Sequence, residues 1–209
     1  MYMKLINLID KCLNFVVLCS KKYNIDESHA LLHSIEVLHY AKKILHSELE
    51  ANPYLHEQKD IIYTSAILHD MCDNKYVVEK EGLHRIDQFL SPHMEPEKIH
   101  TVLEIISKMS YSKVKKVGFP NLGDHQLAYH IVRESDLLTA YHIPRSIAFT
   151  MIKLDKTYSN GLDDIRLLFE QRMLHQIKDS LFVTKYSQQQ AFKLHNETLR
   201  SLDDYTCKF

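Results

Sequence analysis

The chain has 209 residues and almost balanced charge, with 26 Lys and Arg against 27 Asp and Glu. This balance provides no basic field for a phosphate backbone and therefore argues against a protein that binds nucleic-acid polymers. Only 4 Gly and 5 Pro occur, too few for the turns of a β-sandwich or β-barrel or for a glycine-rich phosphate loop, so we expect long helices.

The first half of the chain has the periodicity of helices separated by short turns. Apolar residues at helical spacing predict an amphipathic helix over 4–20, and its longest apolar run, Phe15 to Cys19, is far shorter than the roughly 20 residues of a membrane span. Further helices are expected over 26–49, 57–71, 83–90 and 95–111, with Asp26 or Ser28 capping the first of these. We therefore expect a cytoplasmic protein with no membrane partner, whose apolar N-terminal helix offers a surface for a homodimer.

The second half continues the pattern after one stretch that looks like a loop. Residues 112–123, which contain Gly118, Pro120 and Gly123, predict this loop, and helices are expected over 124–141 and 144–157. Residues 159–161 predict a turn, and 163–205 predict two helices or one bent helix. Because no strand-like alternation exceeds four residues, the sequence predicts an all-α, single-domain helical bundle over 1–209.

The cysteines indicate a reducing compartment. None of the four forms a Cys-x-x-Cys pair, which argues against a structural zinc knuckle, and we expect reduced, mostly buried thiols; the four are Cys12, Cys19, Cys72 and Cys207. Cys72 lies three residues after His69 and so shares its helical face. We expect it to be a buried thiol rather than a metal ligand.

Two of the 14 histidines lie on faces that should point inward. His33 shares a helical face with Val37 and Ala41, and His69 shares one with Ala66. A buried imidazole needs partners for its ring nitrogens. Both histidines therefore require a polar or metal partner in the core.

Two carboxylates complete this pattern. Asp70 directly follows His69, about 100° further around a helix, and Asp136 interrupts an otherwise apolar helix. A carboxylate beside an apolar stripe is costly unless its charge is compensated. Two imidazoles and two carboxylates on three inward faces suit a divalent cation such as Mn, Fe, Co, Ni or Zn, and Mg less well.

At these residues the chain resembles the HD-domain superfamily of metal-dependent phosphohydrolases. The matching segments are His33-Ser-Ile-Glu-Val, Ala-Ile-Leu-His69-Asp70-Met-Cys-Asp73-Asn-Lys75 and Ile-Val-Arg-Glu-Ser-Asp136-Leu-Leu-Thr-Ala. The resemblance covers about residues 25–150. It extends to the end of the chain, where the segment that begins at Phe182 resembles the closing segment of one bacterial subgroup, that of nucleotide pyrophosphohydrolases and nucleotidases. It implies an HD-type helical domain with its motifs within 25–150 and C-terminal helices over 163–205 packed on it.

The resemblance also implies a metal site. His33, His69, Asp70 and Asp136 would hold one divalent ion (Mn, Co, Ni, Fe, Zn or Mg), with places left for a water and a phosphoryl oxygen. Such an ion lowers the pKa of water and neutralises charge on phosphoryl oxygens. The implied reaction is hydrolysis of a phosphate ester or phosphoanhydride of a small metabolite, foremost a nucleotide.

Further residues receive roles from the same resemblance. Asp70 is expected to accept the proton of the attacking water, and Asp73 either shuttles a proton or caps the turn. Lys75 is expected to contact a substrate phosphate as a point charge, the alternative being a surface lysine. His29, four residues before His33, is expected either to line the substrate pocket or to lie on the surface.

The third motif departs from the subgroup's usual Asp-Ala-Asp-Arg-Leu-Asp-Ala. Leu137 stands in place of the Arg and Thr139 in place of the last Asp, while Glu134 and Ser135 replace the first two residues. Two alternatives to a hydrolase therefore stay open. One is a module that retains the metal and binds a nucleotide with little catalysis, and the other is a helical protein whose His and Asp form a polar network in the core.

Overall fold

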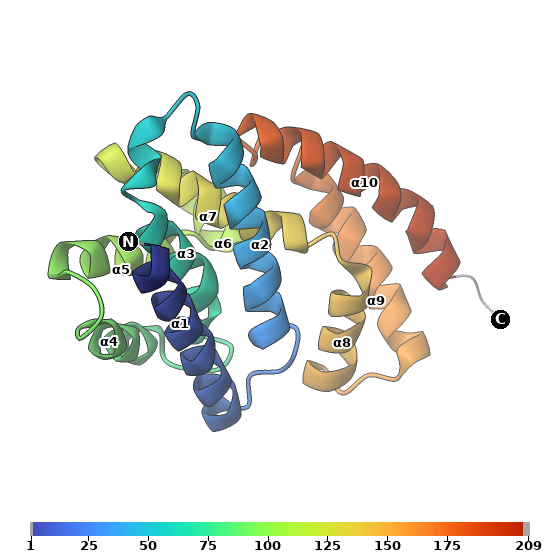
Figure 1. Ribbon diagram of the computed structural model, residues 1–209. Coiled ribbons are helices and arrows are strands. Elements are labelled where there is room, and N and C mark those ends of the chain that lie inside the picture. The colour runs from blue at the N-terminus through green and yellow to red at the C-terminus, as the bar shows by residue number, and fades with distance from the viewer. Residues whose placement is uncertain (1, 207–209) are drawn as a thin grey trace.

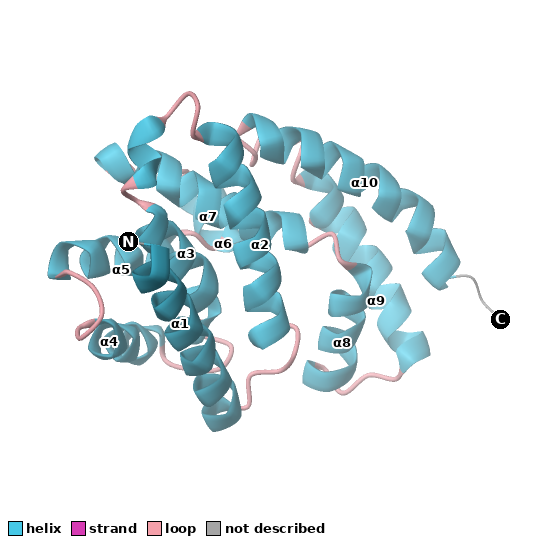
Figure 2. Ribbon diagram, viewed as in Figure 1, coloured by secondary structure: helices cyan, strands magenta, loops and turns pink. Residues whose placement is uncertain are grey.

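The chain folds into helices joined by short connections, with no strand among residues 2–206, which this computed structural model describes (Figure 2). The α-helices are α1 (Tyr2–Tyr23), α2 (Leu31–Glu48), α3 (Lys59–Leu68), α4 (Glu79–Leu90), α5 (Pro96–Lys108), α6 (Tyr111–Val117), α7 (Gln126–Thr139), α8 (Ile143–Lys153), α9 (Tyr158–Gln171) and α10 (Lys185–Thr206). Short 3₁₀ helices η1 to η4 cover Pro53–His56, His69–Cys72, Gly123–His125 and Met173–His175. The predicted all-α, single-domain helical bundle is confirmed.

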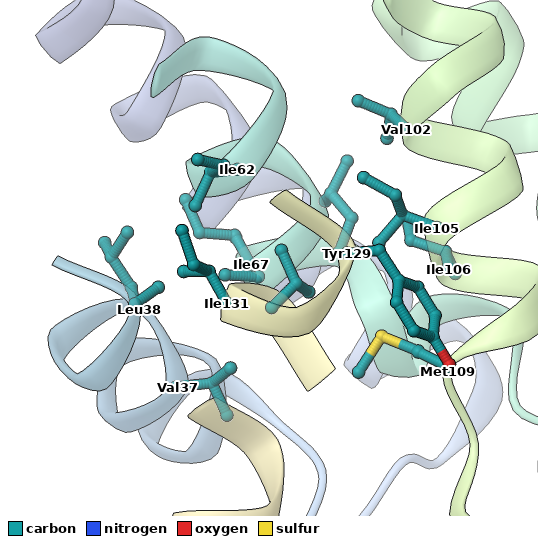
Figure 3. Close-up of a cluster of buried hydrophobic side chains, with 14 of the residues drawn as sticks. Val37, Leu38, Ile62, Ile67, Val102, Ile105, Ile106, Met109, Tyr129 and Ile131 are labelled. Carbon is teal, nitrogen blue, oxygen red and sulfur yellow. The ribbon is translucent and has the colours of Figure 1, made fainter. Parts of the chain in front are cut away.

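The main core lies where α2, α3, α5 and α7 meet (Figure 3). Figure 3 shows Val37 from α2, Ile67 from α3, Ile105 from α5 and Ile131 from α7 directed toward one another, and all are buried. Each such side chain contributes about 1.5–3 kcal/mol when it leaves water. This packing brings α2, the end of α3 and α7, which carry the predicted metal donors, into contact.

A second, smaller apolar cluster joins α8 and α9 to the bundle; it contains Ala140, Ile143, Ile165, Phe169, Met173 and Leu202. Figure 1 shows α8 and α9 side by side, with α10 next to α9. Gly161 allows the close approach of α9 to α8, because a Cβ there would lie 2.8 Å from Thr150 Oγ1. We refer to residues 143–171 as the α8–α9 hairpin.

Two predicted non-helical segments contain helix starts. The loop expected over 112–123 is wrong for its first half, because α6 begins at Tyr111, with Ser110 as its N-cap, and continues to Val117. Residues 118–122 lie outside helices, as predicted. The turn expected over 159–161 is also wrong, since these residues form the first turn of α9 and Thr157 Oγ1 accepts a hydrogen bond from the backbone N–H of Asn160. Ser, Thr and Asn favour both turns and helix N-termini, so these residues alone do not distinguish the two.

Several predicted helix boundaries were also wrong. The helix expected over 26–49 begins only at Leu31, and neither Asp26 nor Ser28 caps it. Instead, Asp26 Oδ1 accepts a hydrogen bond from the backbone N–H of Ser28 at 3.0 Å, which stabilises a turn before α2. The helix expected over 83–90 begins earlier, at Glu79. The stretch 163–205 contains the rest of α9, η4 and α10.

The cysteines and the hydropathy agree with expectation where the structure describes them. Cys12, Cys19 and Cys72 are free and buried, whereas Cys207 lies outside the described residues. Within 2–206 no helix combines the length and the apolar character needed to cross a bilayer.

Candidate metal centre

The predicted metal donors meet where α2, the end of α3 and α7 adjoin. His33 Nε2 lies 3.1 Å from His69 Nε2, 3.2 Å from Asp70 Oδ2 and 3.4 Å from Asp136 Oδ1. His69 Nε2 lies 3.3 Å from Asp70 Oδ2 and 3.7 Å from Asp136 Oδ1. Three residues, His33, His69 and Asp136, each offer one donor atom, and these atoms all lie within 4.8 Å of one another. The three residues could therefore hold a metal ion. Asp70 adds a fourth donor beside both imidazoles.

The His-Asp pair lies in a 3₁₀ turn rather than in the α-helix that we predicted. α3 ends at Leu68, and η2 begins at His69. His69 Nδ1 donates a hydrogen bond to the carbonyl oxygen of Ala66 at 2.9 Å. With one proton held on Nδ1, Nε2 is the ring nitrogen that faces the cluster, and this is the nitrogen that a metal would bind in place of a second proton.

The charge of the cluster fits a divalent cation. Burial by itself raises the pKa of Asp70 and Asp136, but the adjacent imidazoles hold the pKa of both carboxyls well below the usual range. Burial likewise opposes protonation of His69, yet the two carboxylates raise its pKa well above the usual value. Asp70 Oδ2 is buried and has no partner with hydrogen-bond geometry, although both imidazoles are near it. A cation would satisfy that oxygen and compensate the two carboxylates.

Arg145 is a site residue that our sequence analysis missed. It comes from the first turn of α8; its Nη1 contacts both ring nitrogens of His33, Nε2 at 3.2 Å, and donates to Thr139 Oγ1 at 2.8 Å. The site therefore contains an arginine even though Leu137 stands where the third motif usually has one. A positive charge in the first turn of a helix opposes the helix dipole. The position of Arg145 at the start of a predicted helix was therefore the sequence signal that could have indicated a functional role.

Asp73, Lys75 and His29 lie together at the rim of the site. Asp73 Oδ1 accepts a hydrogen bond from the backbone N–H of Lys75 at 2.9 Å, so Asp73 stabilises the turn after η2. Lys75 Nζ lies 3.1 Å from His29 Nε2 and 3.4 Å from Asp73 Oδ2. His29 is buried in the connection before α2 and contacts Ser28 Oγ through Nδ1, at 2.6 Å. The catalytic or substrate-binding roles of these three residues stay predictions.

A pocket of about 450 Å³ opens over the donors. His69, Asp70 and Asp136 lie on its bundle side, and Arg145 and Arg172 lie on the side of the α8–α9 hairpin and η4. This volume suits a small molecule. A separate hollow of about 960 Å³, bordered by residues such as Gln58 and His130, contains none of the four donors.

Neighbouring residues of the pocket have other partners. Lys113 pairs with Glu79, and Lys115 Nζ lies 2.8 Å from Asp179 Oδ2, so both lysines are in ion pairs. The Cys72 thiol contacts the carbonyl oxygen of His69 at 3.7 Å, and burial raises its pKa to about 12. It is thus a neutral buried thiol, as the sequence predicted.

Comparison with known proteins identifies a structural relative. No protein-family model matches the chain, and no curated protein matches it significantly. The crystal structure of selenomethionine-labelled YpgQ from Bacillus subtilis superimposes with a TM-score of 0.68 over 96% of each chain, at 19% sequence identity. At this identity the similarity shows a shared fold.

Proposed function

We propose that this protein is a metal-dependent phosphohydrolase of the HD-domain type, acting on a small phosphorylated metabolite, foremost a nucleotide. One observation carries the proposal. Donor atoms of His33, His69, Asp70 and Asp136 converge at a pocket of about 450 Å³, in the sequence order of the HD-domain motifs. The similarity to YpgQ supports the fold and gives no information about the reaction.

Four residues would bind the metal, and one of them, Asp70, would also accept a proton. His33, His69, Asp70 and Asp136 would hold one divalent ion, which when bound acidifies a water and withdraws charge from phosphoryl oxygens. Asp70, kept ionised by its neighbours and 13% exposed in its side chain, is the base for the proton of the attacking water.

The basic groups at the pocket are suited to the charge of the substrate. Arg145 contacts His33 beside the donors, and Lys75 Nζ lies 3.1 Å from His29 Nε2 at the rim. A guanidinium donates hydrogen bonds to phosphoryl oxygens and stabilises the charge that develops on them. An anionic substrate is therefore favoured over a neutral one.

Elemental analysis and an activity panel test this proposal. The purified full chain should contain a stoichiometric divalent metal and release phosphate or pyrophosphate from at least one nucleotide with Mn, Co, Ni or Mg. His69→Ala and Asp136→Ala should remove both metal and turnover, whereas His100→Ala, at an exposed histidine of α5, should retain them.

Two results would contradict the proposal. One is a folded, metal-loaded protein that turns over no member of the panel, and the other is turnover unaffected by His69→Ala. Tight nucleotide binding without hydrolysis would instead identify the protein as a module that retains the metal and binds a nucleotide. This outcome is worth measuring because Leu137, next to Asp136, stands where the third motif usually has an arginine.

A further inference from the structure

Two arginines of the pocket have no carboxylate partner within the described residues. The other basic groups of the lining are paired, Lys75 with Asp73 and Lys113 with Glu79. Arg145 and Arg172 line the same pocket without such an ion pair. Since a guanidinium stays protonated in proteins, the pocket carries two positive charges that no nearby carboxylate neutralises through direct contact.

Arg172 is held in place without a hydrogen-bond acceptor. It follows α9, and its guanidinium lies over the ring of Tyr111, 4.3 Å from the ring centre. Its Nε is buried and has no hydrogen-bond partner, and burial lowers its pKa from the ordinary value. A desolvated, cationic N–H group without an acceptor is unfavourable, so the arrangement favours a bound anion.

Arg145 occupies a different place in the pocket, in direct contact with a metal donor. Its Nη1 lies 3.2 Å from His33 Nε2 and donates to Thr139 Oγ1 at 2.8 Å. When His33 binds a metal through Nε2, the other ring nitrogen carries a proton and cannot accept from an arginine. The guanidinium then keeps Thr139 as one acceptor and has donors left for a phosphoryl oxygen near the metal.

We infer that Arg172, stacked on Tyr111, forms a subsite for a second phosphoryl group, linked to the one that Arg145 contacts beside the four metal donors. The ligand class is thus a diphosphate or longer chain rather than a monophosphate. This inference rests on the proposed function, because it assigns a specificity-determining residue to the same site. Tyr111 is a positioning residue that restrains the guanidinium plane through its ring.

Binding measurements test the subsite without relying on turnover. The probes are methylphosphonate, with one phosphoryl-type group, and methylenediphosphonate, with two groups that water does not separate. Each is titrated calorimetrically into the full chain at one constant Mg²⁺ concentration. Wild type should bind the diphosphonate at least about tenfold tighter than the monophosphonate, since a second charge-assisted contact forms.

The variants identify which arginine supplies the difference. Arg172→Gln should remove the preference for the diphosphonate while leaving the affinity for methylphosphonate and for Mn²⁺ unchanged. Arg145→Gln should weaken both phosphonates. Arg200→Gln, the same loss of charge at an exposed position of α10, should change neither. Tyr111→Leu keeps the charge but removes the stacking ring, and should lower the diphosphonate affinity several-fold.

The inference is overturned if Arg172→Gln binds the diphosphonate like wild type, or if wild type does not prefer it. Should Arg172→Gln fail to fold, as judged by circular dichroism, Tyr111→Leu decides the question by the same criterion. The two proposals fail separately. A wild-type chain that hydrolyses a nucleotide but does not prefer the diphosphonate refutes only the subsite. A metal-loaded chain that hydrolyses no member of the panel refutes the proposed function, whichever phosphonate it binds.

Discussion

Gly82 of α4 lies directly against Cys72 of η2. A Cβ on Gly82 would stand 2.6 Å from both Cα and Cβ of Cys72 and 3.1 Å from the carbonyl oxygen of Met71. Real Cβ atoms do not approach other atoms so closely, and backbone is among the atoms in the way. The 3₁₀ turn that carries His69 and Asp70 is therefore positioned by a glycine in a different helix.

Gly82→Ala should destabilise the protein and weaken metal binding. Over-packing typically costs about 1–3 kcal/mol, which exceeds the gain of about 1 kcal/mol from replacing glycine by alanine inside a helix. Urea denaturation measures the first effect and Mn²⁺ titration the second. Gly161→Ala is the matched control, because it crowds Thr150 Oγ1 in the α8–α9 hairpin and should lower stability alone. A destabilised Gly82→Ala variant with wild-type Mn²⁺ affinity would refute the coupling.

Metal binding should raise the thermal stability of the chain. A ligand that binds only the folded state stabilises it by about 2.7 kcal/mol at a concentration of about 100 times Kd. Thermal unfolding with added Mn²⁺, Co²⁺ or Ni²⁺ measures the shift, and a chelator should reverse it. His69→Ala should abolish the shift. Cys72→Ala should retain it, because the Cys72 thiol is not one of the proposed ligands and its hydrogen bond goes to the backbone carbonyl oxygen of His69. An equal shift in the His69→Ala variant would show that the ion binds elsewhere.

The fully buried carboxylate of Glu134 should be essential for attaching the C-terminal segment. Its Oε1 accepts from the backbone N–H of Val183 at 2.7 Å, and its Oε2 accepts from the backbone N–H and hydroxyl of Thr184 at 3.1 and 2.7 Å. Breaking a buried charge network costs roughly 3–5 kcal/mol. Glu134→Ala should approach that loss in chemical denaturation and speed amide exchange at residues 183–184. Glu197→Gln, at a half-exposed carboxylate of α10, should do neither, and a stable Glu134→Ala would contradict this account.

Acid should destabilise the protein in part through His130. Burial, reinforced by the charge of Arg133, lowers the pKa of His130 from 6.5 to about 4. Between these values the unfolded chain binds a proton that the folded chain excludes. The contribution of His130 is therefore complete above about pH 6.5 and is lost as the pH falls toward 4, by up to about 3 kcal/mol.

The unfolding free energy measured against pH tests this prediction. His130→Gln should lose stability less steeply than wild type between pH 6.5 and 4. His100→Gln, at a histidine whose side chain is 77% exposed, should follow the wild-type curve. Parallel curves for wild type and His130→Gln would show that His130 titrates at its ordinary pKa.

Lys75→Gln should impair substrate binding more than chemistry. The ammonium lies at the rim, 3.1 Å from His29 Nε2, and its side chain is 48% exposed. Removing a point charge on a substrate phosphate should raise KM several-fold with kcat and Mn²⁺ affinity nearly unchanged. Lys80→Gln, at an exposed lysine of α4, provides the control. If KM stays at the wild-type value, Lys75 is a surface lysine.

Helix periodicity explains why the bundle side of the site could be predicted. His33, His69 and Asp136 interrupt apolar stripes, and polar groups on buried faces must meet partners. The order of these residues along the chain was enough to expect one cluster, and the structure brings their donor atoms within 4.8 Å. The 3₁₀ geometry of the His-Asp turn was not predicted; the end of this turn packs against Gly82 of α4, a contact between distant segments that local periodicity does not report.

The sequence by itself thus determined the all-α class and the four candidate donors, since both follow from local periodicity and from the cost of burying polar groups. The other wall of the pocket was decided only by tertiary structure. Three of its residues share no motif: Tyr111 begins α6, Arg145 lies in α8, and Arg172 lies between α9 and η4. They meet because the α8–α9 hairpin packs through residues such as Ile165 and Phe169, and packing between distant segments sets where a side chain points.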